Sequence, residues 1–397
     1  MKRLTFLFIL AVIICNSCLL QSSEKRESRI EPAALQTHDY LSILKNKKVA
    51  VVANHTSLLE QTHLVDSLLS LGIDIQKIFS PEHGFRGKAD AGEHVKNYFD
   101  QKTGLPVISL YGSSKKPNLK DLKGIDIVVF DLQDVGVRFY TYISTMHYVM
   151  EACAEMGVKL LILDRPNPNG FYVDGPVLDT AHRSFVGMHP VPIVHGMTIA
   201  EFAQMINGER WLKDELQCDL SFIPCKNYSH DSLYQLPLNP SPNLQNMLSV
   251  YLYPSLGFFE GTSLSVGRGT EFPFQVFGGP DLQNVEFTFT PQSVDGASKY
   301  PKHENKKCYG VDLRNINVQK LISQERINLE WLIFAYQNVK NQDDFFNTFF
   351  YNIAGNKVLR EQIVQGKSAE EIRATWQKDL NEFKIIREKY LIYKDFE

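Results

Sequence analysis

Short apolar runs alternate with amphipathic stretches between about residues 40 and 210. Five runs have the length of buried strands, namely Val49–Ala53, Ile75–Phe79, Pro106–Leu110, Ile125–Phe130 and Leu160–Leu163. Two stretches between them, Thr62–Leu71 and Tyr140–Met156, space their apolar residues as packed helices do. This alternation predicts a parallel sheet covered by helices on both faces. Right-handed crossovers then bring the carboxyl ends of the strands to one edge.

Four of these runs open abruptly into clusters of polar residues. The clusters are Asn54–Ser57, Ser80–Gly87, Asp131–Arg138 and Asp164–Gly170. Because ligands bind outside the carboxyl ends of the strands in open α/β sheets, we expect the four loops to form one site. Turn formation alone explains Asn167–Gly170, but it does not explain the charged residues of the other loops.

The chain is long enough for two domains, and its pattern changes near residue 212. Its 397 residues exceed what one core usually organises. Helix-like segments dominate from Gln319 onward, and Ala369–Lys389 has the apolar spacing of an amphipathic helix docked on the surface. We therefore predict a larger α/β domain over residues 37–211 and a smaller α/β domain over residues 212–397.

The first residues predict export. Two basic residues after Met1 precede an apolar stretch, Leu4–Ile14, that is too short to span a bilayer stably. We predict a signal peptide over residues 1–18 and a polar tether over residues 19–36. Cys18 and the serine before it resemble the junction of a bacterial lipoprotein signal, with ordinary cleavage nearby as the alternative. The expected location is the periplasm or the outer surface, with a lipid anchor at Cys18.

Composition narrows the partners and cofactors. A net charge of -3 and a pI near 6.4 provide no bulk field for nucleic acid or an anionic membrane, so membrane contact is expected only through the anchor. No Walker-type sequence or complete dinucleotide fingerprint occurs, so no nucleotide cofactor is expected. The four cysteines of the mature region are Cys153, Cys218, Cys225 and Cys308. No two of them form a Cys-x-x-Cys pair, which favours buried free thiols over a zinc site.

Glu82 is the first candidate for catalysis. It follows an apolar run and a proline, and Gly84 behind it lets a ligand approach closely. A carboxyl in such a place can be partly desolvated, which raises its pKa and suits general acid catalysis near neutral pH. A structural ion pair with Arg86 is the alternative explanation.

The loop after the fourth run offers further carboxylates. Asp131 and Asp134 can divide into an acid and a base if their environments differ, although helix capping explains Asp131 equally well. Arg138 in the same segment can grip a carboxylate bidentately. The segment also supplies amide and hydroxyl groups that read sugars, from Gln133, Tyr140 and Tyr142.

Other polar residues have divided interpretations. Asp164 and Arg165 form either an ion pair that rigidifies their loop or part of a binding site, and a lone histidine such as His195 is more often structural. Glu260 and Arg268 lie on glycine-flanked loops that could close the site from the second domain. Side chains that can bind a divalent metal occur at His83, Asp90, Glu93 and His94. Their spacing fits no common metal site, so no metal is expected.

Together these motifs closely resemble the exo-β-N-acetylmuramidases of the NamZ type, over nearly the whole chain after the tether. The matching segments are Ser80–Gly87, Asp90–Glu93, Phe130–Tyr142, Asp164–Pro168, Glu260–Thr262 and Gly267–Thr270. The resemblance implies a Rossmann-like parallel-sheet domain, a smaller α/β domain and an active site in the cleft between them. It also implies cofactor-free release of terminal β-linked N-acetylmuramic acid from the non-reducing end of peptidoglycan fragments, in cell wall recycling.

The resemblance places the catalytic glutamate at Glu82, which would protonate the leaving oxygen. The second catalytic group stays open among Asp134, Asp131, Glu93 and Glu260. The lactyl carboxylate of muramic acid calls for an arginine, with Arg138 ahead of Arg268 and Arg86. Further substrate-binding candidates are Asn54, His83, Gln133, Tyr140, Tyr142, Asp164, Arg165, Asn167, His195 and Glu260. The competing hypothesis is a surface lipoprotein that binds muropeptides without cleaving them.

Overall fold

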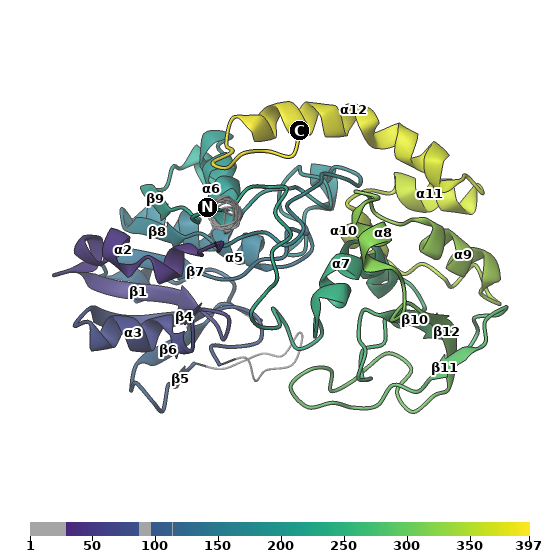
Figure 1. The fold of residues 1–397 in the computed structure, drawn as a ribbon, viewed down its shortest axis with the longest axis horizontal. Coiled ribbons are helices and arrows are strands. Elements are labelled where there is room, and N and C mark those ends of the chain that lie inside the picture. The colour runs from purple at the N-terminus through teal and green to yellow at the C-terminus, as the bar shows by residue number, and fades with distance from the viewer. Residues whose placement is uncertain (1–28, 87–96, 113) are drawn as a thin grey trace, which may run out of the picture. The chain divides into compact units, whose positions relative to one another are not determined.

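A seven-stranded sheet organises the first half of the chain (Figure 1). The computed structural model describes residues 29–86, 97–112 and 114–397, and Glu31–Glu397 form one unit apart from Met1–Ile30. In sheet order the strands are β5 (Tyr98–Phe99), β6 (Pro106–Ser109), β4 (Asp74–Ser80), β1 (Lys48–Ala53), β7 (Ile127–Asp131), β8 (Lys159–Leu163) and β9 (Leu220–Ile223). All neighbours are parallel except β5 and β6.

The central strands are buried because their side chains alternate between two apolar layers. In β1, Val49 and Val51 belong to one core cluster, whereas Ala50 and Val52 belong to the other. The first cluster is covered by α2 and α3 and the second by α5 and α6. The helices of this region are α2 (Thr37–Leu44), α3 (Leu64–Ser70), α4 (Leu119–Leu122), α5 (Tyr142–Met156) and α6 (Ile199–Gly208). The predicted parallel sheet with helices on both faces is confirmed.

The five predicted strands are all present, whereas β5 and β9 were not predicted. Both lie at the edges of the sheet. All four residues of β9 are only half-buried, so this strand lacks the continuous apolar run that marks the central strands. Because β9 pairs with β8, the large sheet extends past residue 211, the predicted end of the first domain.

A smaller antiparallel sheet and several helices form the second part of the fold (Figure 1). Its strands, in sheet order, are β10 (Val276–Gly279), β12 (Cys308–Asp312) and β11 (Phe287–Phe289). Its helices are α7 (Met247–Leu256), α8 (Val318–Ile322), α9 (Glu330–Asn338), α10 (Phe349–Ala354), α11 (Val358–Val364) and α12 (Ala369–Glu388). Minor elements are a hairpin of β2 (Leu58–Leu59) and β3 (Thr62–His63), and the 3-10 turns η1 (Ala33–Leu35), η2 (Thr180–His182), η3 (Lys213–Glu215) and η4 (Gly257–Gly261).

The predicted terminal amphipathic helix is confirmed as α12. Ser368 and Glu371 form a capping box at its start, and its buried face carries Ile372, Trp376, Leu380 and Phe383. Figure 1 shows α12 running from α11 back toward α6. At its end, Arg387 donates to the carbonyl of Gly196 at 2.7 Å, so the helix fastens the C-terminus to the first region.

The described end of the predicted tether is part of the fold. Ala33 is fully buried, its N–H donates to the carbonyl of Asp164 at 3.0 Å, and Gln36 is buried as well. The tether therefore has to end before these residues. Cys18 and the predicted signal peptide lie outside the described residues. Within the described part of the chain, no helix is long and apolar enough to cross a bilayer.

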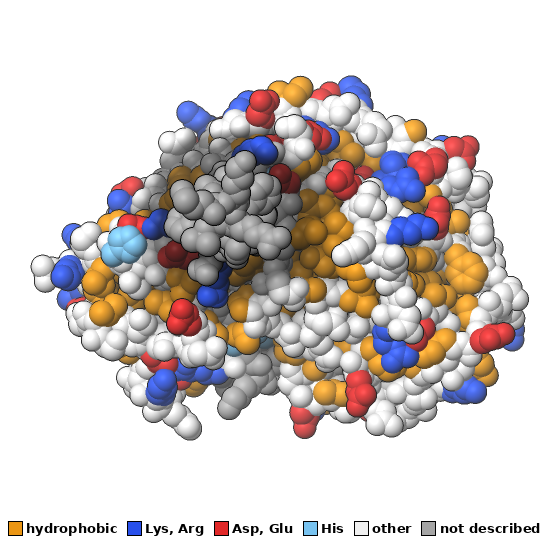
Figure 2. Space-filling view, viewed as in Figure 1, with side chains coloured by type: hydrophobic (Ala, Val, Ile, Leu, Met, Phe, Trp, Pro, Cys, Tyr) orange, Lys and Arg blue, Asp and Glu red, His pale blue; other side chains and the backbone are white. Residues whose placement is uncertain are grey.

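Cys153, Cys218, Cys225 and Cys308 are buried free thiols, as predicted. On the face in Figure 2, acidic and basic side chains are interspersed, with hydrophobic side chains exposed between them.

Candidate active site

Glu82 lies at the carboxyl edge of the large sheet, two residues after β4 ends. His83 and Gly84 behind it have left-handed backbone conformations, with φ of 70° and 75°, so the chain turns sharply here. Thr141 Oγ1 donates a hydrogen bond of 3.0 Å to Glu82 Oε2. Tyr111 also hydrogen-bonds to this carboxylate, and burial together with the nearby Glu82 raises the pKa of Tyr111. The loops after β4, β6 and β7 therefore meet at Glu82.

Tyr253 on α7 connects this edge to the second half of the chain. Its pKa is raised by burial first, and then by the carboxylates of Glu260, Glu82 and Asp134. Arg268 donates through Nε and Nη2 to Glu260 at 3.0 and 2.9 Å, and its charge also interacts with Glu82. Arg268 Nη1 is buried and has no hydrogen-bond partner in the described part of the chain. The hydrogen-bonding capacity of this N–H group is therefore unsatisfied among the described residues.

Asp134 is a second buried carboxyl group close to this cluster. Its Oδ2 accepts a hydrogen bond of 2.7 Å from the N–H of Gly136, whereas its Oδ1 is buried without a partner among the described residues. Burial raises the pKa of Asp134 to about 7. Its charge also contributes to the raised pKa of Tyr142, as that of Glu82 does. A carboxyl with a pKa near 7 is suited to proton transfer at neutral pH.

Replacing Asp134 with asparagine is expected to change how stability depends on pH. A carboxyl whose pKa is raised from 3.8 to about 7 by folding contributes stability below about pH 4, and this contribution is lost as the pH rises to about 7. The variant lacks this titration and can still accept the N–H of Gly136. Chemical denaturation from pH 4 to 8 should show the free energy of unfolding of Asp134→Asn rising relative to that of the wild type, by on the order of 1–3 kcal/mol at pH 7. Asp343→Asn, at an exposed position, is the control, and parallel curves for Asp134→Asn and the wild type would contradict the buried titration.

Asp131 and Arg165 form a buried ion pair. Arg165 donates through Nε and Nη2 to the two carboxylate oxygens at 2.5 and 2.9 Å, and both residues are almost fully inaccessible. The predicted alternative of a loop-stabilising ion pair therefore applies to Arg165, but its partner is Asp131 rather than Asp164. Both groups of this pair are occupied with each other, which favours a structural role over the predicted catalytic and binding roles.

Arg138 and Arg86 correct the predicted order of the arginines. Arg138 is completely buried, and its two terminal nitrogens donate to four backbone carbonyls, those of Pro176, Val191, Ile353 and Ala354. It has no accessible edge with which to bind a substrate carboxylate. Arg86 pairs bidentately with Asp100 at 3.1 and 2.9 Å, so the predicted alternative pair with Glu82 does not describe its main contact. Arg138 Nε and Arg268 Nη1 are both buried without a partner among the described residues, and of these two arginines Arg268 is the one whose charge interacts with Glu82.

Three other predicted binding residues are part of the protein interior. Asp164 Oδ2 accepts a hydrogen bond of 2.6 Å from the hydroxyl of Tyr393, near the C-terminus. Asn167 Nδ2 donates to the carbonyl of Met197 at 2.9 Å. Burial lowers the pKa of His195 to about 3, so the imidazole is neutral at physiological pH. These contacts connect loops to one another and offer no surface to a substrate.

Four other predicted residues are buried and form hydrogen bonds within the protein, namely Asn54, Gln133, Tyr140 and Tyr142. Asn54 Nδ2 donates to the hydroxyl of Tyr142 at 2.7 Å, and the Tyr140 hydroxyl donates to the carbonyl of Pro240 at 2.7 Å. Gln133 Nε2 donates to two backbone carbonyls, and its Oε1 is buried without a partner in the described residues. The contacts of Tyr140 and Tyr142 hold the segment that carries Thr141.

The predicted site and the observed cluster overlap only partly. Asp90, Glu93 and His94 lie outside the described residues. Thr141 and Tyr111 contact Glu82 but were not predicted as site residues, although Thr141 lies within the Phe130–Tyr142 motif. Tyr111 follows the one apolar run, of the five, after which no polar cluster was noted. Tyr253 lies inside an apolar helix, where no local pattern distinguishes it from a core residue.

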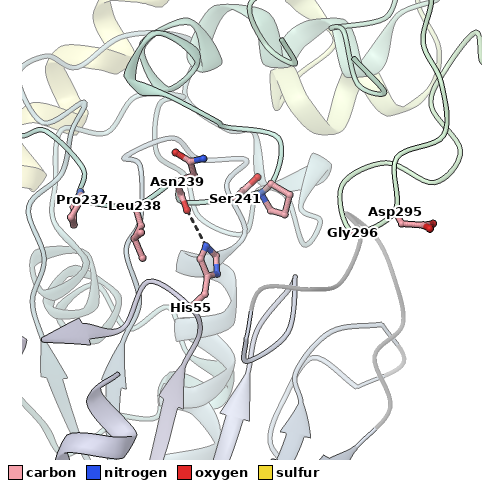
Figure 3. Close-up of a pocket in the computed structure, with 8 residues that line it drawn as sticks. His55, Pro237, Leu238, Asn239, Ser241, Asp295 and Gly296 are labelled. Carbon is pink, nitrogen blue, oxygen red and sulfur yellow. Dashed lines mark hydrogen bonds between the residues drawn. The ribbon is translucent and has the colours of Figure 1, made fainter. Parts of the chain in front are cut away.

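A cavity of about 650 Å³ lies at the end of β1 (Figure 3). One wall is His55, whose Nε2 lies 2.9 Å from the carbonyl oxygen of Asn239. In Figure 3, Asp295 and Gly296 approach from a separate segment. The described lining residues are His55, Pro237, Leu238, Asn239, Ser241, Pro242, Asp295 and Gly296.

The sheet, with carboxylates at its edge, has the arrangement of α/β enzymes whose active sites lie at the carboxyl ends of the strands. Residues 49–248 match the N-terminal part, and residues 251–393 the C-terminal part, of the family described as exo-beta-N-acetylmuramidase NamZ. The chain therefore belongs to the exo-β-N-acetylmuramidase NamZ family, which confirms the resemblance seen in the sequence.

Individual relatives support this assignment. The chain is 39% identical over 375 residues to the peptidoglycan beta-N-acetylmuramidase NamZ of Bacillus subtilis (strain 168), covering 89% of both chains. A DUF1343 family protein from Bacteroides fragilis NCTC 9343, solved at 1.30 Å, has a TM-score of 0.87 and 49% identity, covering 93% of this chain and all of that one. A second DUF1343 protein from that strain has a TM-score of 0.74 and 28% identity over 92% of this chain and 99% of its own.

Proposed function

We propose that the protein is an exo-acting glycoside hydrolase that releases terminal β-linked N-acetylmuramic acid from the non-reducing end of peptidoglycan fragments. Family membership supports this activity, and so does the printed activity of the Bacillus subtilis relative. The structural observation that supports this activity is the position of Glu82. Thr141 and Tyr111 hold its carboxylate at the sheet edge, where it interacts with the charge of Arg268.

Glu82 protonates the oxygen of the leaving sugar in this proposal, because two oriented hydroxyl groups fix its carboxyl at the edge where ligands bind. Asp134 is the second group. Its raised pKa suits it to act as a base, whereas Glu260 is bound by Arg268 and Asp131 by Arg165. Thr141 and Tyr111 position the acid.

The direct test is to incubate the protein with the disaccharide of N-acetylmuramic acid β-linked to N-acetylglucosamine. Chromatography with mass detection should show both free monosaccharides appearing at equal rates. With longer fragments, muramic acid should appear only when it is the non-reducing terminal residue. Binding of the disaccharide without any product over several hours would reject the hydrolase.

Arg268 is the residue that recognises the lactyl carboxylate in this proposal. The free Nη1 can donate a charge-assisted hydrogen bond to it, while Nε and Nη2 stay fixed on Glu260. Replacing Arg268 with lysine keeps a positive charge but removes the planar fork. We expect product inhibition by N-acetylmuramic acid to weaken about 10- to 100-fold, and inhibition by N-acetylglucosamine to change little.

Arg86→Lys is the matched control for that measurement, because Arg86 is also bound bidentately by a carboxylate, Asp100, but has no part in the proposed lactyl contact. If Arg268→Lys weakened both sugars equally, the guanidinium would not be reading the lactyl group.

Export with a lipid anchor at Cys18 is the proposed cellular setting. The charged start, the short apolar stretch Leu4–Ile14 and Cys18 support it, and the polymer from which the substrate derives lies outside the cytoplasmic membrane. Cells fed a clickable fatty acid should label the wild-type protein, and Cys18→Ala should lose both the label and its place in the membrane fraction. Cys15→Ala is the control, and full labelling of Cys18→Ala would reject the anchor.

A further inference from the structure

Both main walls of the cavity at the end of β1 are connected to the segment that holds Glu82. His55 directly follows Asn54, which hydrogen-bonds to Tyr142, and the pKa of Tyr142 responds to Glu82. On the other wall, the Tyr140 hydroxyl holds the carbonyl of Pro240, in the middle of the segment that lines the cavity. Tyr140 and Tyr142 flank Thr141, the residue that holds Glu82. The cavity is therefore built on the segment that orients the proposed acid.

The lining combines apolar surface with neutral polar groups. Leu238 is 39% exposed and, with the prolines at 237 and 242, offers apolar surface to the C–H face of a sugar ring. His55, Asn239 and Ser241 supply hydrogen-bonding groups, and His55 Nδ1 is buried without a partner among the described residues. Burial lowers the pKa of His55, which keeps the imidazole neutral.

The charged residues that line the cavity indicate which sugar of the substrate it binds. Its described lining contains a single charged residue, Asp295, and no lysine or arginine. Among the described lining residues, a carboxylate-bearing sugar such as muramic acid meets no cation and would be repelled by Asp295. The cation with a free N–H, Arg268, lies in the Glu82 cluster instead. A neutral N-acetylhexosamine fits the cavity.

We propose that this cavity is the subsite for the leaving sugar, a neutral β-linked N-acetylglucosamine unit that Glu82 protonates as it departs. The inference rests on the proposed hydrolase activity and adds the position and chemistry of the leaving-group side. The apolar wall at Leu238 carries the sugar ring, and the polar groups around His55 bind its amide and hydroxyl groups.

The test compares two substrates of one enzyme. The variant Leu238→Ser removes the apolar wall at an exposed position, and Leu233→Ser, 55% exposed in the same segment but outside the cavity lining, is the matched control. One substrate is the muramic acid–glucosamine disaccharide, and the other is N-acetylmuramyl fluoride, whose leaving group is too small to reach the apolar wall. We expect Leu238→Ser to raise KM for the disaccharide about five- to tenfold and to leave kcat/KM for the fluoride within about twofold. Leu233→Ser should change neither value.

Equal losses on both substrates, or no loss on either, would overturn the assignment of the cavity. A protein that cleaves neither substrate would instead reject the proposed function, and a binding measurement then decides about the cavity by itself. In that case methyl N-acetyl-β-glucosaminide is titrated into the wild type and into Leu238→Ser, with binding followed by NMR. Weaker binding to the variant supports the subsite, and equal binding or none to the wild type overturns it.

Discussion

Replacing Glu82 with glutamine is expected to reduce kcat/KM for the muramic acid–glucosamine disaccharide by about 10³- to 10⁴-fold, the contribution typical of a positioned general acid. The amide has nearly the shape of the carboxyl group, and its oxygen can still accept the hydrogen bond from Thr141. It cannot give a proton to the leaving oxygen. The protein should therefore fold and bind as before while hydrolysis fails.

The role of Glu82 can be tested by measuring the same variant on two substrates with different leaving groups. A nitrophenol leaves without much help from a proton, so Glu82→Gln should lose far less activity on nitrophenyl muramide than on the disaccharide. Equal losses on the two substrates would assign Glu82 to another step, and near-wild-type turnover of the disaccharide would remove it from the mechanism. Glu382→Gln, on the exposed face of α12, controls for the loss of one acidic residue.

The parts of the fold that could be predicted are those with a local pattern. β1 and β7 are buried on both faces, so each appears in the sequence as an uninterrupted apolar run. The position of Glu82 followed for the same reason, because the end of an apolar run marks the edge of the sheet where ligands bind. β9 was missed because an edge strand that is only half-buried needs no such run.

The roles of the charged residues depend on contacts between distant parts of the chain, which no local pattern contains. Arg165 and Asp131 were both predicted as site residues. They lie 34 positions apart in the chain, and the folded sheet places them together as an ion pair. Tyr253 and Arg268 join Glu82 from the second half of the chain. Local sequence patterns indicate where charged residues gather, but they do not show which of these residues form ion pairs within the protein.

Arg138 shows this most clearly, and its replacement by methionine is expected to destabilise the protein by on the order of 3–5 kcal/mol. The guanidinium donates to the carbonyls of Pro176 and Val191 and to two carbonyls at the end of α10, more than 200 positions further along the chain. It therefore joins the two halves of the fold. Although burial lowers its pKa to about 9, it stays charged at neutral pH. Methionine fills similar space but donates no hydrogen bond, so all four carbonyls lose the guanidinium, although that of Val191 still accepts from the N–H of Leu178.

Denaturant unfolding at neutral pH measures this loss, and two further variants identify its cause. Arg138→Lys keeps a charge but cannot reach all four carbonyls, so its stability should fall between the wild type and Arg138→Met. Arg326→Met, which removes an exposed ion pair with Glu370, should cost less than about 1 kcal/mol. If Arg138 instead bound the lactyl group, Arg138→Lys would unfold like the wild type and weaken only the binding of N-acetylmuramic acid. We expect the opposite, because the four carbonyls already hold both of its terminal nitrogens inside the protein.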